Sequence, residues 1–503
     1  YELEKGTYSI SLRTDAHTVK NTTGIVRNGV IEYKISNNIL LDVNGNEVAE
    51  ATNTNKFTGD NALDGVSIDA EDEVEGRLPF VSRASFPTTA PAKEADRALS
   101  DEARALNRYT QEMATAWDNA QTDILGNPVN KEAHQEKAGS LSITDNGNSA
   151  TELGLTLGSD YDNAQWEELL SQVSMTDMKN FVGKAALATN AVSSIGLPDV
   201  RNLDGPSQIG GFSTNNYRTT GFPNATVIAQ TWNTSLVLQF GTALGKEGVA
   251  KGVRGWLGPG INLHRSPFAG RNYEYYSEDG FLTGKIAAAA INGAKNAGMY
   301  CYLKHLVLYE AETNREALYT WLSEQSLREI YLKPFEIVVK EVGCVGIMTS
   351  YNRIGAVWTG GSEALITGVL RDEWGYNGAI ITDWSDNHSY MNIDQAVRAG
   401  GNRFMSGGDQ WLYSTDSARM QAQIKEAFKG YVYTYLNAFW QNQNPVGTDE
   451  VISMGQTTPS FVWWIPLIID IDLAVVFGCG LWTYFLLRPV QKPKRSMSAK
   501  SKI

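Results

Sequence analysis

Gly378-Ala-Ile-Ile-Thr-Asp-Trp-Ser-Asp-Asn387 is the stretch of this sequence that says most about its fold. Its first four residues are small or apolar and include two β-branched isoleucines, a run too short for a helix that predicts a buried strand. The strand ends at Thr382 and Asp383. In parallel α/β folds, ligands bind at the carboxyl ends of the strands. Asp383 is therefore a candidate catalytic residue, although taken alone it is more simply a cap for the helix that follows.

The same succession of a short apolar strand and a helix recurs over residues 151–430. The clearest strands are 255–264, 299–304, 345–349 and 379–382, and the helices between them include 284–297 and 323–342. Repeated alternation of this kind favours an α/β fold built on a (β/α)8-type barrel. A doubly wound open sheet is the alternative, but no GxGxxG motif follows any of these strands.

Polar side chains follow four of the predicted strands. They are His264, Arg265 and Arg271 after the first, Lys304 and His305 after the second, Ser350, Tyr351 and Asn352 after the third, and Asp383 after the fourth. Strand ends of one barrel converge on a common mouth, so we expect these groups to share one pocket. A carboxylate among cations and aromatic residues suits sugar hydroxyls, with Trp384 and Tyr351 facing the apolar side of a pyranose ring. Individually, Lys304 also fits a structural ion pair, and Tyr351 fits an aromatic residue at the rim.

Composition and charge narrow the class of ligand. The chain has 503 residues, of which 42% are hydrophobic and 20% are charged, as in ordinary globular proteins. Its formal net charge is -13; the last sixteen residues contribute +6, so the remainder carries -19. An acidic body argues against nucleic acid as a partner, because it would not neutralise phosphates. The three cysteines and five scattered histidines form no disulfide framework or metal motif, so neither a metal nor an organic cofactor is expected.

The segments that flank the predicted barrel differ in character. Residues 1–50 alternate apolar and polar positions in short strands, and we expect them to be the tail of a β-sandwich domain. Residues 51–150 are expected to be an extended connector with one helix near 96–118, and residues 431–460 a spacer. The chain begins with Tyr1 and no secretory signal precedes it, which is typical of a processed product or a fragment.

Residues 461–487 are nearly all apolar and long enough to be a transmembrane helix, with Trp463 and Trp464 as an interfacial belt. Residues 488–503 are basic and would form a cytoplasmic tail by the positive-inside rule, which leaves the catalytic body facing outward. A buried core helix is the alternative for 461–487, but the run of basic residues after it favours a membrane anchor.

Nine motifs in this sequence resemble those of the glycoside hydrolase family 3 β-glucosidases, and they occur in the family's order. They are the block 258–279 and the segments Leu203-Asp-Gly-Pro206, Phe222-Pro-Asn-Ala-Thr226, Thr231-Trp-Asn233, Lys304-His305, Glu312-Thr-Asn-Arg315, Met348-Thr-Ser-Tyr-Asn352, Leu370-Arg-Asp-Glu-Trp-Gly375 and Thr382-Asp-Trp384. The resemblance covers roughly residues 150–415. It implies a catalytic barrel, with residues 1–50 as the end of the family's fibronectin-like domain.

By resemblance, Asp383 would be the nucleophile of a retaining hydrolase that removes terminal β-D-glucosyl residues through a covalent glycosyl-enzyme intermediate. The subsite for the non-reducing sugar would be lined by Asp204, Arg271, Lys304, His305, Met348 and Tyr351, with Trp384 beside it and Arg315 in support. Retention requires two carboxyls about 5 to 5.5 Å apart. Neighbouring Lys304 and Arg271 would keep Asp383 ionised.

The second carboxyl, the acid/base, is expected from elsewhere. In family members with reversed domain order it belongs to an α/β-sandwich domain, which here would lie upstream of Tyr1 or on a partner chain. The resemblance favours such an absent residue over Glu310 or Glu312. The loop Leu306-Val-Leu-Tyr-Glu310 and the pair Ser385-Asp386 depart from the family's usual residues. The alternatives are a membrane-anchored carbohydrate-binding or sensory module without turnover, and a fragment that does not fold by itself.

Overall fold

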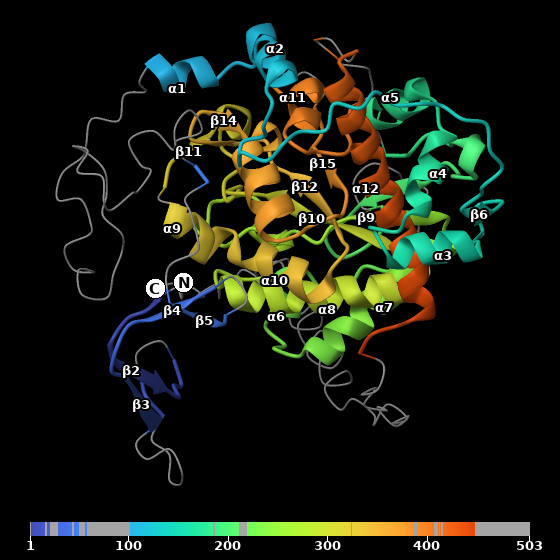
Figure 1. Cartoon of the computed structure of the whole chain (residues 1–503). Coiled ribbons are helices and arrows are strands. Elements are labelled where there is room, and N and C mark those ends of the chain that lie inside the picture. Colours follow the sequence, from blue (N-terminus) through green and yellow to red (C-terminus); the bar gives the residue numbers. More distant parts are fainter. Residues whose placement is uncertain are drawn as a thin grey trace, which may run out of the picture. The chain divides into compact units, whose positions relative to one another are not determined.

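Five parallel strands form the central sheet of this protein, seen in a computed structural model (Figure 1). The structure describes residues 2–15, 18–20, 29–42, 45–49, 56–57, 101–184, 187–210, 219–322, 324–385, 390–406, 411, 413 and 416–447. The predicted membrane anchor 461–487 and the basic tail 488–503 lie outside these ranges. Of the helices within them, none combines the length and the apolar run that a membrane crossing requires.

The order of the strands distinguishes a barrel from a doubly wound sheet, the two alternatives that the sequence left open. Along the sheet the strands are β15 (Ile380–Ile381), β12 (Gly346–Thr349), β10 (Tyr300–Leu306), β9 (Val253–Leu257) and β8 (Arg201–Asp204). Each new strand along the chain adds beside the previous one, always at the same edge. A doubly wound sheet would reverse this order at a switch point. The succession is that of a barrel and excludes the doubly wound alternative.

The sheet is a parallel half-barrel, whereas the sequence predicted eight strands. Arg403 continues the sheet only as a single parallel bridge to Ile381, after which the chain enters a helix. Among the described residues from 151 to the start of β8, the longer regular elements are the helices α3 (Glu152–Ser159), α4 (Gln165–Ser171) and α5 (Met175–Gly183). The described residues therefore form a parallel half-barrel of five strands, which is part of the predicted (β/α)8-type barrel.

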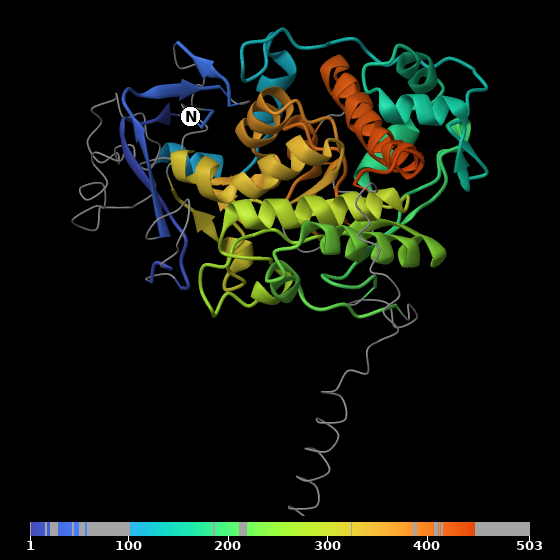
Figure 2. The ribbon, with the colours of Figure 1, turned by 90° about the horizontal axis from the view of Figure 1, so that it is seen from below.

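One face of the sheet is covered by the helices that connect its strands. These are α6 (Ala225–Ala229), α7 (Thr234–Ala250), α8 (Gly280–Asn296), α10 (Lys333–Val342) and the π-helix η9 (Ala364–Glu373). Asn233 and Asp279 cap α7 and α8, each accepting a hydrogen bond from a backbone N–H in the first turn. Trp256, Leu303 and Ile347 point into this core. Figure 2 shows α7 and α8 lying side by side along the sheet.

The other face is covered mainly by α12 (Ala418–Gln443), together with α3 to α5. Tyr300 of β10 and Tyr431 of α12 lie with their hydroxyl oxygens 2.8 Å apart, and Tyr435 stacks on Tyr300 edge to face at 6.2 Å. The boundary between barrel and spacer, expected at residue 430, falls inside this helix. The helix continues to Gln443 because residues such as Tyr431, Tyr435 and Phe439 keep burying side chains against the core.

The N-terminal strands pair in antiparallel fashion. They are β1 (Glu2–Leu3), β2 (Gly6–Ser11), β3 (Val30–Ile35), β4 (Ile39–Leu41) and β5 (Glu47–Val48), with β2 paired to β3 and β4 to both β1 and β5. Short strands were expected here; their assignment to a sandwich domain remains a prediction. The helix expected near 96–118 is two helices, α1 (Asp101–Leu106) and α2 (Gln111–Asn119). Thr110 begins the second by accepting a hydrogen bond from the Met113 backbone N–H.

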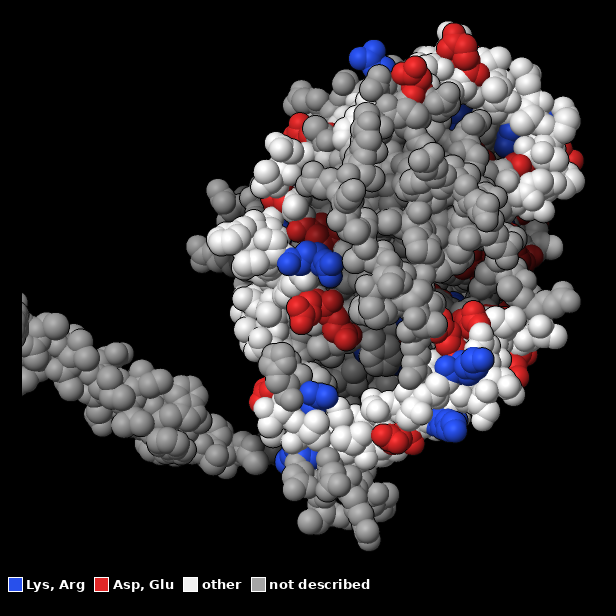
Figure 3. Space-filling model, turned by 90° about the vertical axis from the view of Figure 1, so that its left-hand side faces the viewer, with Lys and Arg blue, Asp and Glu red and all other residues white. Residues whose placement is uncertain are grey.

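The remaining elements are short. They are the hairpin β6 (Thr144–Asp145) and β7 (Ser149–Ala150), the strands β11 (Tyr319–Thr320), β13 (Arg353–Ile354) and β14 (Val357–Trp358), the helices α9 (Glu324–Ser326) and α11 (Ile393–Arg398), the 3-10 turns η4 (Ser193–Ile195), η5 (Asn272–Glu274), η6 (Arg315–Ala317) and η8 (Thr359–Gly361), and the π-turn η7 (Leu327–Tyr331). Acidic and basic side chains lie side by side on the face shown in Figure 3.

Candidate active site

The predicted site residues come from the ends of adjacent strands and meet at one edge of the sheet. Asp204 ends β8, Lys304 and His305 lie near the end of β10, Met348 is in β12, and Asp383 follows β15 by two residues. Lys304 pairs with Met348, and Met348 with Ile381, so the strand register brings these side chains together. As expected from their positions at strand ends, these side chains therefore lie near one another in the structure.

Asp383 is held in a largely buried position, with 15% of its side chain exposed. Its Oδ1 accepts a hydrogen bond from the Trp384 backbone N–H at 2.7 Å. Burial raises the pKa of the Asp383 carboxyl, while Arg271, the Trp384 N–H, Lys304 and the Tyr351 hydroxyl act in the opposite direction. Burial is the larger effect, so the pKa of Asp383 lies above its usual value, and the nearby charges and donors limit the rise.

Lys304 and Asp204 form an ion pair at 2.7 Å. Only 2% of the Lys304 side chain is exposed, compared with 33% for Asp204. The Asp204 Oδ1 also accepts a hydrogen bond from the Gly205 N–H at 2.7 Å. The two interpretations of Lys304 are therefore compatible: it is an ion-pair partner, and its charge still acts on Asp383.

Arg271 is the centre of a second group of charges. Its Nε contacts the buried Glu274, one terminal nitrogen lies 3.2 Å from Glu312, and the other donates to His305 Nε2 at 3.1 Å. Glu312 also accepts from Arg315 at 3.1 Å. The sequence predicted Arg271 and Arg315 as site residues but not the carboxylates that hold them. Glu274 lies three positions after Arg271 in the motif block 258–279. Its charge and its closeness in sequence could have indicated that it pairs with Arg271.

Aromatic residues complete the edge of the site. Tyr309 donates to Glu312 at 3.0 Å and packs edge to face against both His305 and Tyr351. The Arg315 guanidinium lies 4.7 Å above the Tyr351 ring, so that face of the ring is occupied. Trp384 is only partly buried, and it remains the better candidate to face a sugar ring. The sequence analysis named the loop with Tyr309 only because it departs from the family's usual residues, and it did not predict that Tyr309 contacts the site.

His305 is fully buried and neutral. Burial lowers the pKa of its imidazole well below the usual value, and Arg271, Lys304 and Arg315 lower it further. The Nε2 atom lies 3.7 Å from Asp383 Oδ2, and because the ring is uncharged this contact is not an ion pair. Among the described residues, no group of three or more His, Cys, Asp and Glu side chains is placed to hold a metal ion.

Glu310 has the chemical character of a general acid but sits apart from Asp383. Burial raises the pKa of its carboxyl to about 7. Its Oε1 accepts hydrogen bonds from the Leu263 backbone N–H at 3.4 Å and from the Asn262 amide at 3.5 Å. The same Asn262 amide nitrogen donates to the His305 carbonyl at 2.9 Å, so Asn262 links Glu310 to His305.

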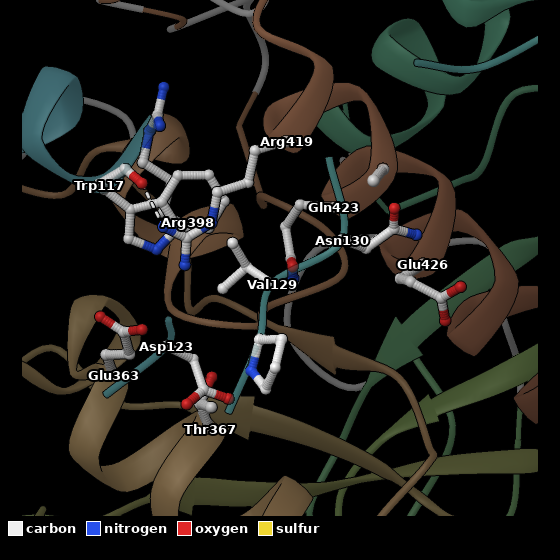
Figure 4. Close-up of a pocket in the computed structure, with 12 residues that line it drawn as sticks. Trp117, Asp123, Val129, Asn130, Glu363, Thr367, Arg398, Arg419, Gln423 and Glu426 are labelled. Carbon is white, nitrogen blue, oxygen red and sulfur yellow. Dashed lines mark hydrogen bonds between the residues drawn. The ribbon is translucent and has the colours of Figure 1, made fainter. Parts of the chain in front are cut away.

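A cavity of about 210 Å³ lies elsewhere, between the loop after α2, η9, α11 and α12 (Figure 4). None of the predicted site residues lines it. The Trp117 ring, its most conspicuous aromatic group, lies beneath the guanidinium groups of Arg398 and Arg419, at 4.8 and 3.6 Å. The Trp117 ring is therefore engaged by two guanidinium groups of the cavity wall.

Comparison with known proteins agrees with this geometry. A β-glucosidase from Rhizobium radiobacter is 36% identical over 269 residues, which are 52% of this chain and 32% of that protein. The structure of β-glucosidase 3B from Thermotoga neapolitana in complex with α-D-glucose is 29% identical and matches 56% of this chain and 44% of that one, with a TM-score of 0.50. A β-glucosidase from Paenibacillus barengoltzii, 24% identical, shares the fold over 87% of this chain and 45% of that one, with a TM-score of 0.59.

This chain spans about a third of the length of the curated relative it matches. Residues 171–433 match the N-terminal domain of glycosyl hydrolase family 3, a stretch that covers half of the chain and contains every predicted site residue. That match, together with the strand order and the carboxylate at the end of β15, shows that the protein belongs to glycosyl hydrolase family 3.

Proposed function

We propose that this chain carries the sugar-binding and nucleophile-bearing part of a retaining β-glucosidase, and that Asp383 forms the covalent glycosyl-enzyme intermediate. The observation that carries the proposal is the setting of Asp383, a largely buried carboxylate at a strand end beside Lys304, Arg271 and Tyr351. Family membership and the names of the relatives, which are β-glucosidases, support a β-glucoside as substrate.

The chemistry follows from these positions. The Asp383 carboxylate would attack the anomeric carbon of a terminal β-D-glucosyl unit, and the aglycone oxygen would leave with a proton from an acid/base residue. Asp204 and Lys304 would bind sugar hydroxyls through charged hydrogen bonds, with Arg271 and His305 beside them and Met348 and Trp384 on the apolar side. Water would then hydrolyse the ester with retention.

The acid/base would come from a domain outside this chain, in a partner chain or upstream of Tyr1. Glu274 and Glu312, which lie near Arg271, are each held in ion pairs. This observation also favours a second candidate, a carbohydrate-binding or sensory module that does not turn over. Anchoring in a membrane through 461–487, with the barrel outside the cell, remains part of the proposal and rests on the apolar sequence alone.

The test uses a 2-fluoro-β-glucoside with a dinitrophenolate leaving group, followed by peptide mass mapping. This reagent needs no general acid, and its 2-fluoro substituent slows hydrolysis of the intermediate. We expect a label on the peptide containing Asp383 in the wild type and in Asp199→Asn, which alters an exposed carboxylate, but not in Asp383→Asn. Absence of a label on the folded wild type, or a label elsewhere, would refute Asp383 as nucleophile and favour the binding module.

A further inference from the structure

The amide of Asn262 makes three contacts with a single residue, His305. Its Oδ1 accepts from the His305 backbone N–H at 2.8 Å and lies 3.2 Å from the ring Nδ1, and its Nδ2 donates to the His305 carbonyl at 2.9 Å. The backbone N–H can only donate and the carbonyl can only accept, so the orientation of the amide is determined. Asn262 is itself buried, with 1% of its surface exposed.

This arrangement determines which ring nitrogen of His305 carries the proton. Because Oδ1 of Asn262 is an acceptor, the Nδ1 facing it must be the donor. The other side of the ring leads to the same result independently. The Arg271 guanidinium has no lone pair to offer and donates to Nε2 at 3.1 Å, so Nε2 must be unprotonated.

We propose that Asn262 is a positioning residue, which holds His305 as the Nδ1–H tautomer so that its bare Nε2 anchors Arg271 and donates no proton to Asp383. Nε2 lies 3.7 Å from Asp383 Oδ2. In the opposite tautomer an N–H would face the Arg271 N–H groups and would donate to Asp383 instead. A donated hydrogen bond stabilises a carboxylate and weakens it as a nucleophile. The catalytic consequence rests on the proposed function; the tautomer does not.

Several ionisable groups face His305 and bear on its protonation. They are Lys304, Arg271 and Arg315, the hydroxyl of Tyr275, the ring of Tyr309, and the carboxylate of Asp383. The three cations oppose a charged imidazole. Glu310 stands behind Asn262, with Oε1 3.5 Å from the amide nitrogen, and adds a second acceptor that holds the amide in place.

The first measurement is the 15N spectrum of histidine-labelled wild-type protein, with His305 assigned by its loss in His305→Gln. We expect a protonated Nδ1 and a bare Nε2 that persist as the pH is lowered through the range in which exposed histidines titrate. A protonated Nε2 in the wild type overturns the proposal, whatever the enzyme does with glucosides. This readout is independent of activity, so it separates a failure of the tautomer from a failure of the proposed function.

The second measurement is the pH profile of Asp383 labelling in Asn262→Asp. A carboxylate beside Nδ1 raises the pKa of His305, so at acidic pH the ring gains an Nε2–H that turns to Asp383. We expect labelling to fall by up to about 100-fold there and to recover as the pH rises and His305 loses that proton. Asn202→Leu, which alters a buried asparagine on β8 without a contact to His305, should leave the shape of the profile unchanged. A uniform loss in Asn262→Asp, with His305 titrating as in the wild type, overturns the proposal.

Discussion

Asp383 shows how the environment of one residue combines opposing effects. Burial favours the neutral acid, whereas two cations, a backbone N–H and a tyrosine hydroxyl favour the carboxylate. A group balanced in this way can be ionised and yet poorly solvated. Glu310, in the same region, has no cation in direct contact among its described partners, and its pKa rises to about 7. Burial thus raises the pKa of both carboxyls, and different partners oppose the rise at each.

The raised pKa of Glu310 predicts a pH-dependent stability. The pKa rises from 4.5 to about 7, so between these values the native state binds more protons than the unfolded chain. The free energy of unfolding therefore decreases as the pH rises through this window. Glu310→Gln lacks this effect and can still accept from Leu263. We expect it to be more stable than the wild type by about 1 to 3 kcal/mol above pH 7, an amount reduced by partial exposure.

Chemical unfolding of both proteins at several pH values measures this difference. The gain should disappear below about pH 4.5, where both native and unfolded Glu310 are protonated. Glu278→Gln, which changes an exposed glutamate, serves as the control and should show no such pH-dependent gain. A gain for Glu310→Gln that is the same at pH 4 and pH 8 would show that the carboxyl is not the cause.

At the scale of elements, the crossing of α7 and α8 depends on glycine. A Cβ added to Gly241 would meet the carbonyl oxygen of Ala290, and one added to Gly293 would meet that of Leu238. The two backbones approach so closely that each helix presents a glycine to the other. These helices cover the sheet behind the site, so their spacing also sets the positions of the strands they connect.

For these glycines, helix propensity and packing predict opposite effects of a substitution by alanine. Alanine is the better helix former by about 1 kcal/mol, yet Gly241→Ala and Gly293→Ala should each lower the free energy of unfolding by about 1 to 3 kcal/mol through overpacking. Gly368→Ala in η9 is the matched control, because its Cβ would lie 3.6 Å from the Lys56 side chain, an ordinary contact. Denaturant unfolding of the three variants decides between the effects. Equal stability of Gly241→Ala and Gly368→Ala would contradict the close crossing.

The same scale explains where prediction from sequence succeeded and where it failed. Four of the five strands of the sheet were recognisable because strands buried on both faces form continuous apolar runs. The fifth, β8, reads Arg-Asn-Leu-Asp and was not predicted, because it contains no such run. The predicted boundary between barrel and spacer at residue 430 falls inside helix α12, whose mixed composition gives no local signal of where the helix ends. Its burial is decided by Tyr300 and other residues more than a hundred positions away in the chain.

At the scale of the whole molecule, the chain covers about a third of the curated relative. Its described residues form the half-barrel and gather the sugar-binding candidates. Our proposal assigns the acid/base to a further domain. Nucleophile and acid act together when the glycosidic bond breaks, but only the contribution of the acid depends on the leaving group. Without the acid, leaving groups that need a proton should react slowly, and those that do not should still react.

We therefore expect this chain to react with 2,4-dinitrophenyl β-D-glucoside and to cleave cellobiose very slowly. General acid catalysis contributes about 100- to 10,000-fold, so the ratio of the two rates should exceed that of a full-length β-glucosidase by at least about 100-fold. Release of dinitrophenolate and of glucose measures the two reactions, with Asp383→Asn as the blank. Efficient cleavage of cellobiose would show that the chain contains its own acid, and its loss in Glu310→Gln would identify that residue.

The sequence by itself determined the parallel α/β class, the family and the set of polar residues at the strand ends, because periodicity and motifs lie in consecutive residues. The roles assigned to these residues remain predictions. Only the tertiary structure decided that five strands rather than eight form the described sheet, that α12 covers its other face, and that Asn262 contacts His305. The last pair is 43 positions apart, and its contact depends on how neighbouring strands and loops pack, which no local pattern encodes.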